Sequence, residues 1–564
     1  MKIRLLITIY LVFLPIEGIS QETPKPDSKL RHIKDQSEEI SKRMKVTKDV
    51  FTQSLSKPPE NQNFPIETPC FKINRVELNG EYSDYFDWLK KILNNTNNKN
   101  SPVSKCIGIQ GINFVISIAQ NQIVAKGYVT SRVLVQHQDL SSGILLLTFV
   151  PGKINEIKFT NQSLNNSLLI TSMPCDSGEL LNIRDIEQGL ENFKRLSSVD
   201  ANFKIEPVAN GMPGMSNIII DFKQERPIRL TLGLDDSGTK STGIYQGNVT
   251  FSYENLLDIN DIFYFSYIHD LGGGYEGDRS SQAQQFHYSF PWDYWLISLN
   301  ANVNNYDQTV VGDYQEYIYS GNSSNIELRI SHNIHRNHNS KTEASITAFL
   351  RESKNYIDDT EIEVQRRKVG GWNLGFEYKR YYSKSVFNAA INYKIGGSFG
   401  TLSAPEEELN EGTSDFKLIT GYLEFMHPFE YDDYKISYKG SIRLQHNLTT
   451  LTPQDKFAIG GRYTIRGFDG EKTLSAEQGV VFRNELSLIP SQSQQQYYWG
   501  IDYGKVSGQS TKDLIGDNLI GTVLGMRGKV SQFQYDISVG KPISKPRRFK
   551  TQNPTYALSL IWSW

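Results

Sequence analysis

The residues best suited to specific chemistry lie in one stretch, residues 460–471, Gly-Gly-Arg-Tyr-Thr-Ile-Arg-Gly-Phe-Asp-Gly-Glu. Its second arginine, Arg466, carries a planar fork of hydrogen-bond donors that fits a carboxylate. The stretch is too polar and glycine-rich for a membrane strand, and strand-like segments flank it. It therefore predicts a long loop between two strands, centred on Arg466. A solvated loop with two ordinary arginines is the alternative that the stretch alone leaves open.

Side chains for catalysis or metal binding do not gather elsewhere. The nine histidines are scattered, apart from His332, His335 and His338. Their spacing could bind a metal, but the surrounding Asn and Ser residues favour a hydrophilic turn. Proteases and lipases need histidine beside a carboxylate or a serine, and no such set is evident. We therefore expect no catalytic residue, no metal site and no cofactor.

The N-terminus has the pattern of a secretory signal over residues 1–20. Lys2 and Arg4 form its charged region, residues 5–14 its apolar core, and residues 18–20, Gly-Ile-Ser, its cleavage site. A retained membrane anchor is the alternative, but the apolar run is too short to span a bilayer.

An exported chain enters an oxidising compartment, so one pair of its three cysteines could form a disulfide. Cys70 and Cys106 bracket one small predicted domain and are the favoured pair. Cys175 would then be a lone, buried thiol.

Composition restricts the class of protein. The 564 residues carry a formal net charge of −2, which gives no electrostatic reason to expect nucleic acid as a partner. Aromatic residues make up 12% of the chain, yet its mean hydropathy is −0.44. A helical membrane protein would be more apolar, whereas a barrel whose strands alternate apolar and polar residues fits both values.

Shifts in pattern divide the chain into segments. Residues 21–55 are charged, with a thin apolar stripe at helical spacing, and residues 56–68 form a proline-containing linker. Residues 69–151 and 152–225 each combine strand-like and helix-like patterns, so we expect two tandem α/β modules of the β-α-β-β type. The stripe consists of Leu30, Ile33, Ile40 and Met44.

Residues 226–564 alternate apolar with polar residues, often aromatic on one face and charged on the other. A soluble β-sandwich would alternate too, but it would not need that contrast. We therefore expect a transmembrane β-barrel of about 16 strands, at roughly 20 residues per strand and loop. Trp562 and Trp564 share the apolar face of the last strand, which suits a barrel-closing segment and an insertion signal.

Several motifs stand out in the two modules and the barrel: residues 125–133 (Ala-Lys-Gly-Tyr-Val-Thr-Ser-Arg-Val), 138–143, 150–154 and 181–190 in the modules, and residues 462–468 and 499–504 (Trp-Gly-Ile-Asp-Tyr-Gly) in the barrel. With these motifs in this order, the chain resembles the TpsB transporters of two-partner (type V) secretion, which carry two POTRA modules and are relatives of the outer-membrane barrel-assembly factor. The family usually ends in phenylalanine rather than tryptophan, and Ile465 stands where valine is commoner.

The resemblance implies roles for several of these residues. Arg466 is expected to pair with Asp502 inside the barrel, and Glu485 is a weaker candidate for the same network. Arg462, Gly467 and Phe468 would belong to the loop tip. The helix in residues 21–55 would plug the barrel, and a disordered periplasmic tail is the alternative for this segment.

The resemblance also implies a bacterial outer-membrane translocator whose POTRA modules lie in the periplasm. These modules would bind an unfolded exoprotein by strand addition. The client would be a haemolysin, an adhesin or a contact-dependent inhibition toxin. Outer-membrane lipid and the barrel-assembly machinery would be further partners.

A barrel-assembly insertase is the closest alternative, because its superfamily shares this architecture. It usually has more POTRA modules or lacks the haemolysin-type motifs. A diffusion porin would not need periplasmic modules, and an outer-membrane enzyme would need the catalytic set that is not evident here.

Overall fold

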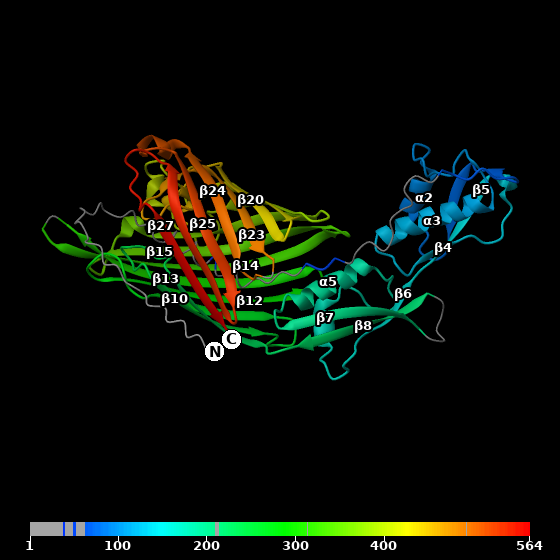
Figure 1. Cartoon of the computed structure of the whole chain (residues 1–564), viewed down its shortest axis with the longest axis horizontal. Coiled ribbons are helices and arrows are strands. Elements are labelled where there is room, and N and C mark those ends of the chain that lie inside the picture. The colour runs from blue at the N-terminus through cyan, green and yellow to red at the C-terminus, as the bar shows by residue number, and fades with distance from the viewer. Residues whose placement is uncertain (1–37, 40–48, 52–62, 209–213, 313, 492) are drawn as a thin grey trace.

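The computed structural model describes residues 38–39, 49–51, 63–208, 214–312, 314–491 and 493–564. The expected signal peptide, most of the N-terminal helix and most of the linker lie outside the described residues. Figure 1 shows two small α/β modules followed by a large barrel, with the second module against one end of it. We call this the module end and the opposite one the far end. No helix among the described residues is long and apolar enough to cross a membrane.

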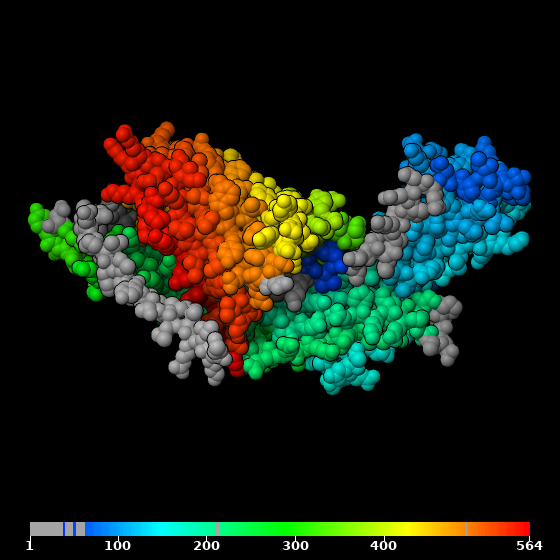
Figure 2. Space-filling model, in the orientation of Figure 1, coloured from blue at the N-terminus to red at the C-terminus, as the bar shows by residue number. Residues whose placement is uncertain are grey.

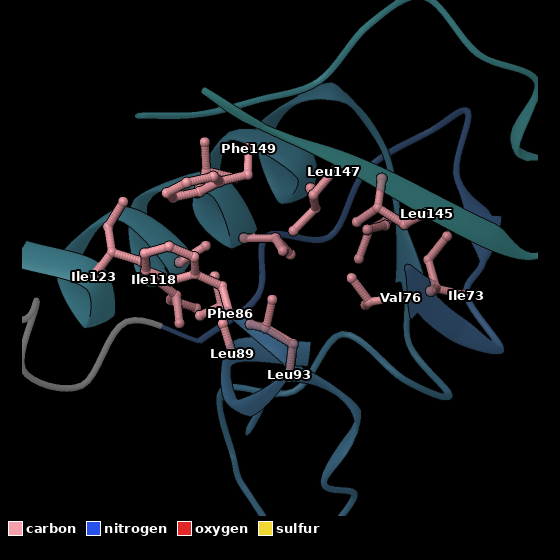
Figure 3. Packing of buried hydrophobic residues seen from close by; sticks show 14 of the residues in the cluster. Ile73, Val76, Phe86, Leu89, Leu93, Ile118, Ile123, Leu145, Leu147 and Phe149 are labelled. Carbon is pink, nitrogen blue, oxygen red and sulfur yellow. The ribbon is translucent and has the colours of Figure 1, made fainter. Parts of the chain in front are cut away.

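Apart from the two short strands β1 and β3, the first module has the order strand, helix, helix, strand, strand. Its elements are β1 (Phe71–Lys72), β2 (Arg75–Asn79), α2 (Asp87–Asn94), β3 (Cys106–Ile107), α3 (Ile109–Ala125), β4 (Arg132–Leu134) and β5 (Ile144–Val150). The main sheet has the order β2–β5–β4. Figure 3 shows Leu89 from α2, Ile118 from α3 and Phe149 from β5 pointing into one core, where each is at least 94% buried. Helix α2 is absent from the expected order, because its eight residues are too few for a clear helical period.

A Cys70–Cys106 disulfide joins the two short strands β1 and β3. Just before it, the Glu67 carboxylate accepts hydrogen bonds from the backbone N–H groups of Gly108, Gln110 and Gly111 at 2.6–3.0 Å. These donors open α3 and have no partner within the helix. The chain entering the first module is therefore fixed to it at two adjacent points.

The second module repeats the order with a longer sheet, β6–β8–β7. Its core contains the free Cys175, which is buried. As in the first module, the short first helix was not expected from the sequence. The elements are β6 (Lys153–Phe159), α4 (Ser167–Ser172), α5 (Ile183–Lys194), β7 (Val199–Pro207) and β8 (Met215–Gln224).

Sixteen antiparallel wall strands close the barrel in the described part of the chain, and β27 pairs with β9. They are β9 (Ile228–Asp235), β10 (Gln246–Glu254), β11 (Ile262–Asp270), β12 (Arg279–Trp292), β13 (Trp295–Val311), β14 (Glu316–Arg336), β15 (Ser340–Ile357), β17 (Arg367–Tyr381), β18 (Val386–Ile395), β19 (Lys417–Tyr431), β20 (Tyr434–Asn447), β23 (Gln478–Pro490), β24 (Gln496–Ser507), β25 (Asn518–Val530), β26 (Phe533–Ser544) and β27 (Thr555–Ser563).

Smaller elements lie between the wall strands. β16 (Thr360–Glu361) extends one hairpin, and β21 (Phe457–Ile459) and β22 (Leu474–Ala476) belong to a loop. The 3-10 turns are η1 (Leu140–Ser142), in the first module, and η2 (Glu363–Gln365), η3 (Pro405–Glu407), η4 (Pro453–Asp455) and η5 (Gln509–Asp513).

The barrel exposes its apolar side chains outward. Trp372, Leu374 and Phe376 of β17 are 40–54% exposed on the outer face. Such a face is stable in lipid, while the alternate residues line a polar lumen. Trp564 closes the seam, because its N–H and carbonyl both hydrogen bond to Leu230 of β9. The expected mainly-β architecture with about 16 strands is confirmed.

The second module packs on the barrel through α4 and α5. Asn192 donates to the Asp293 carbonyl at 2.8 Å, and Arg195 donates to Ser289 at 2.9 Å. The Tyr294 hydroxyl, in the turn between β12 and β13, donates to the Asp185 carboxylate. Burial raises the pKa of Asp185 to about 6, although the Tyr294 hydrogen bond opposes the shift.

We predict that this junction is more stable at pH 5.5 than at pH 7.5. Between pH values of about 4 and 6 the folded protein holds a proton on Asp185 that the unfolded chain releases, so the free energy of unfolding falls as pH rises. The total fall is at most about 3 kcal/mol, and the part above pH 5.5 is less than about 1 kcal/mol. Asp185→Asn should remove this pH dependence. The measurement is the urea midpoint of the second module in the full chain, by pulse proteolysis.

Asp200→Asn, at an exposed position of the same module, is the matched control and should keep the wild-type dependence. An Asp185→Asn protein with an unchanged pH dependence would contradict the assignment.

Candidate functional site

The loop between β20 and β23 folds back into the barrel from the far end. Its strands β21 and β22 pair as a hairpin that carries residues 460–473 at its tip. Apolar residues of the loop pack against the inner wall and against Phe549, because the lumen would otherwise leave them in water. This cluster consists of Phe457, Ile459, Ile465, Phe468, Leu474, Ala476, Val481, Val506, Leu519 and Phe549.

Arg466 joins the loop tip to the wall through its side chain and its backbone. Its Nε and Nη2 each donate to Asp502 at 2.8 Å, in a two-point fork, and its backbone N–H donates to Asp502 at 2.9 Å. Nη1 donates to Glu485 at 2.5 Å, and Nη2 also reaches the Asn484 carbonyl at 3.1 Å. Lysine could not reproduce this set, because it has a single charged nitrogen.

The charges around this fork compensate each other. The Asp502 side chain is fully buried, and those of Arg466 and Glu485 are 11% exposed. Arg527 pairs with Glu485 at 2.6 Å, and Arg483 lies 3.7 Å from Asp502. Buried charges are tolerated only when they are paired and hydrogen bonded, so the loss of one member would leave another uncompensated.

Glycines on three wall strands make room for the tip. A Cβ at Gly521 would lie 2.0 Å from the Arg466 carbonyl oxygen, and one at Gly500 would lie 2.5 Å from its Nη2. A Cβ at Gly540 would lie 2.7 Å from the Cα of Gly467, which itself has φ +99°. That angle suits glycine and strains other residues. The backbone of the loop therefore reaches the wall only because these positions have no side chain.

Further contacts fix the loop on both sides of the tip. Arg462 donates to the Asp236 carboxylate at 2.8 Å, in the segment between β9 and β10. Phe468 packs edge-on against Phe549, with ring centroids 5.7 Å apart. At the start of the loop, Asp455 receives a second guanidinium fork, from Arg351 of β15, at 2.7 and 3.0 Å.

Next to the loop the lumen contains a cavity of about 560 Å³. Glu38 lines it, and Glu38 and Glu39 are helical, so part of the N-terminal segment lies inside the barrel. On β13 and β14 its wall is mainly polar, with one charged pair of residues, Glu327 and Arg329, beside a neutral stretch formed by Ser298, Asn300, Asn302, Asn304, Ser323, Ser324 and Asn325.

The structure brings together most of the residues expected from the sequence. Arg466, Asp502 and Glu485 form one network, and Arg462, Gly467 and Phe468 flank it. Trp562 and Trp564 lie instead at the barrel seam, and Cys70 and Cys106 in the first module.

Sequence reasoning missed Asp236, the Arg351–Asp455 fork and the wall glycines Gly521 and Gly540. A glycine within an alternating strand signals close approach of another backbone, so these two glycines could have been noticed. No local signal marks the two ion pairs.

Comparisons with known proteins match the whole architecture. The model of the haemolysin secretion/activation protein family ShlB/FhaC/HecB matches residues 214–528, a ShlB-type POTRA domain matches 71–152, and a POTRA domain matches 153–207. Outer membrane transporter CdiB-2 of Burkholderia pseudomallei is 32% identical over 90% of this chain and 88% of its own. The solved structure of CdiB from Acinetobacter baumannii matches 96% of this chain and all of its own at a TM-score of 0.85 and 27% identity.

We predict that Gly521→Ala displaces the loop tip from the barrel wall while every charged residue is kept. The added methyl group would lie 2.0 Å from the Arg466 carbonyl oxygen, so the tip must move. Trypsin should then cut at Arg462, Arg466 or Lys472 about tenfold faster or more. A tenfold change corresponds to a loss of roughly 1.4 kcal/mol from the free energy that holds the loop tip against the wall. The measurement is limited proteolysis of protein in lipid nanodiscs, with cut sites identified by mass spectrometry.

Gly421→Ala is the matched control, because a Cβ there meets Leu444 only at 3.5 Å, an ordinary contact. It should be cut at the wild-type rate. Equal cleavage of both variants would show that the wall glycine does not seat the tip.

Proposed function

This chain belongs to the haemolysin secretion/activation family ShlB/FhaC/HecB, and we propose that its barrel exports an exoprotein while the Arg466 loop stays anchored in the lumen. Members of this family are outer-membrane transporters, with the barrel in that membrane and the POTRA domains in the periplasm. The chain is therefore a two-partner secretion transporter. Its module end faces the periplasm and its far end the cell exterior.

The stretch of Ser and Asn side chains on β13 and β14 carries this proposal. It lies half-way around the ring of strands from Asp502 on β24, where the loop tip is fixed. Amides and hydroxyls exchange hydrogen bonds with a passing backbone, and they do not hold it with ion pairs. A client can follow this wall while both guanidinium forks of the loop remain in place.

The N-terminal segment would occupy this route at rest. Glu38 lies in the lumen cavity and is helical, which supports a plug formed by the helix expected in residues 21–55. The plug must leave before a client enters, because the two would share the cavity.

Client recognition would use the free edge of β7 in the second module. In the first module, side-chain amides occupy the middle of both edge strands: Asn94 bonds the N–H and carbonyl of Val76 at 2.8 Å, and Gln120 accepts a hydrogen bond from the N–H of Val133. Among the described residues, no segment pairs with the outer edge of β7. A client strand can add there through backbone bonds that tolerate sequence variation.

Of the client classes expected from the sequence, a contact-dependent inhibition toxin is the one that we propose, because several curated relatives are CdiB transporters. A haemolysin is the second candidate, since the hemolysin transporter protein ShlB of Serratia marcescens is 23% identical over 68% of this chain and 67% of its own. An adhesin remains the third class. Outer-membrane lipid and the barrel-assembly machinery complete the proposed partners, and no catalytic step is needed.

We predict that export depends on the Arg466 network. The test co-expresses the exoprotein encoded beside this chain and measures it in the culture supernatant. Arg466→Ala leaves Asp502 buried without its fork, a change that costs roughly 3–5 kcal/mol in comparable buried pairs. Secretion should fall at least tenfold, while the folded barrel, measured by heat modifiability, stays at the wild-type level.

Lys505→Gln is the control, because Lys505 pairs with Asp517 in an exposed bridge on neighbouring elements. It should secrete normally. Client release that persists without this chain, together with loss of other outer-membrane barrels, would favour a barrel-assembly insertase instead.

A further inference from the structure

Three N-terminal residues, Asp49, Val50 and Phe51, lie at the module end of the barrel, far from the Arg466 loop. Figure 2 shows a dark blue patch from the N-terminal part of the chain between the second module and the yellow-green barrel strands. The three residues contact β14, β15, β17 and the second module. We call the surrounding side chains Arg336, Lys341, Lys379 and Tyr381 the rim pocket.

Asp49 is held by three polar side chains of this pocket. Its carboxylate accepts hydrogen bonds from Lys341, Lys379 and the Tyr381 hydroxyl, and its side chain is only 3% exposed. Burial alone would raise the pKa of Asp49, but the two ammonium groups lower it to about 2. The carboxylate is therefore charged throughout the physiological pH range.

The next two residues are bound through backbone, apolar surface and ring contacts. The Val50 carbonyl accepts a hydrogen bond from Arg336, and the Val50 side chain packs against the core of the second module. The Phe51 ring lies 4.9 Å from the Tyr381 ring and 5.1 Å from the Arg336 guanidinium. The pocket therefore binds an acidic, an apolar and an aromatic side chain in succession.

Two lysines of the pocket lie side by side where Asp49 binds. Lys341 and Lys379 are paired in the register of β15 and β17, so their side chains lie next to each other. Lys341 also pairs with Glu191 at 2.5 Å, which ties it to the second module. Lys379 has Asp49 as its hydrogen-bonded carboxylate. Removal of Asp49 would leave two neighbouring cations only partly neutralised, at about the cost of a broken buried pair.

We propose that the rim pocket is a peptide-binding site for an acidic-apolar-aromatic tripeptide, filled at rest by Asp49, Val50 and Phe51 and offered to a client segment of the same pattern when they leave. The chain's own tripeptide thus acts as an autoinhibitory ligand at the periplasmic mouth of the pore. Only the identity of the client rests on the proposed function.

The test is binding of a capped, fluorescein-labelled peptide with the sequence of residues 48–52, Lys-Asp-Val-Phe-Thr, to the full chain in detergent micelles. The readout is fluorescence anisotropy. The double variant Asp49→Asn/Phe51→Ala weakens the resident ligand, so it should bind the peptide at least tenfold more tightly than wild type. The same peptide with Asn in place of Asp should bind at least tenfold more weakly.

Lys379→Gln, added to the double variant, should lower affinity at least tenfold. Lys439→Gln is the matched control, because Lys439 is a lysine on β20 that pairs with Glu424 at 2.9 Å and does not contact Asp49. Equal binding of the two peptides, or binding that Lys379→Gln does not change, would overturn the site.

Export measured on the same variants separates the two proposals. Normal export with no specific peptide binding overturns the rim pocket alone. The expected peptide binding with no export of any exoprotein supports the pocket and overturns the proposed function.

Discussion

The fork of Arg466 on the buried Asp502 carboxylate is the interaction on which the lumen depends. It fixes a long polar loop against one arc of the wall, where Glu485 and Arg527 complete the charge balance. These buried charges are tolerated because each is paired, and the loss of one partner would leave the other charge buried and unpaired, which destabilises the fold. The loop is thus held in one position, and the opposite arc of the barrel keeps a largely polar wall along the lumen cavity.

Buried ion pairs also hold a segment of the chain at the other end of the barrel. Arg336 contacts Glu191 of the second module at 2.8 Å and the Val50 carbonyl, so one guanidinium joins the barrel, the module and the N-terminal segment. Strand register places Lys341 beside Lys379 to receive Asp49. The barrel therefore holds two inward segments by buried ion pairs rather than by apolar packing alone, which suits segments surrounded by water.

Those features of the fold that follow from local sequence patterns could be predicted from the sequence. Alternation along the strands indicated the barrel, and composition shifts indicated two modules. The glycine-rich stretch pointed to Arg466, and family resemblance supplied Asp502. The short helices α2 and α4 were missed because so few residues show no clear period. Contacts such as Arg351–Asp455 and Asp49–Lys379 join segments over a hundred residues apart, and only the closed barrel brings them together.

Hydrogen–deuterium exchange of residues 460–473, in nanodiscs, tests the central claim most directly. The backbone N–H of Arg466 donates to Asp502, so the account predicts that the wild-type tip exchanges as slowly as the neighbouring wall strands. Asp502→Asn should raise exchange in this segment and leave β13 and β14 unchanged. A wild-type tip that exchanges as fast as an exposed loop would show that the fork does not hold the loop in the lumen.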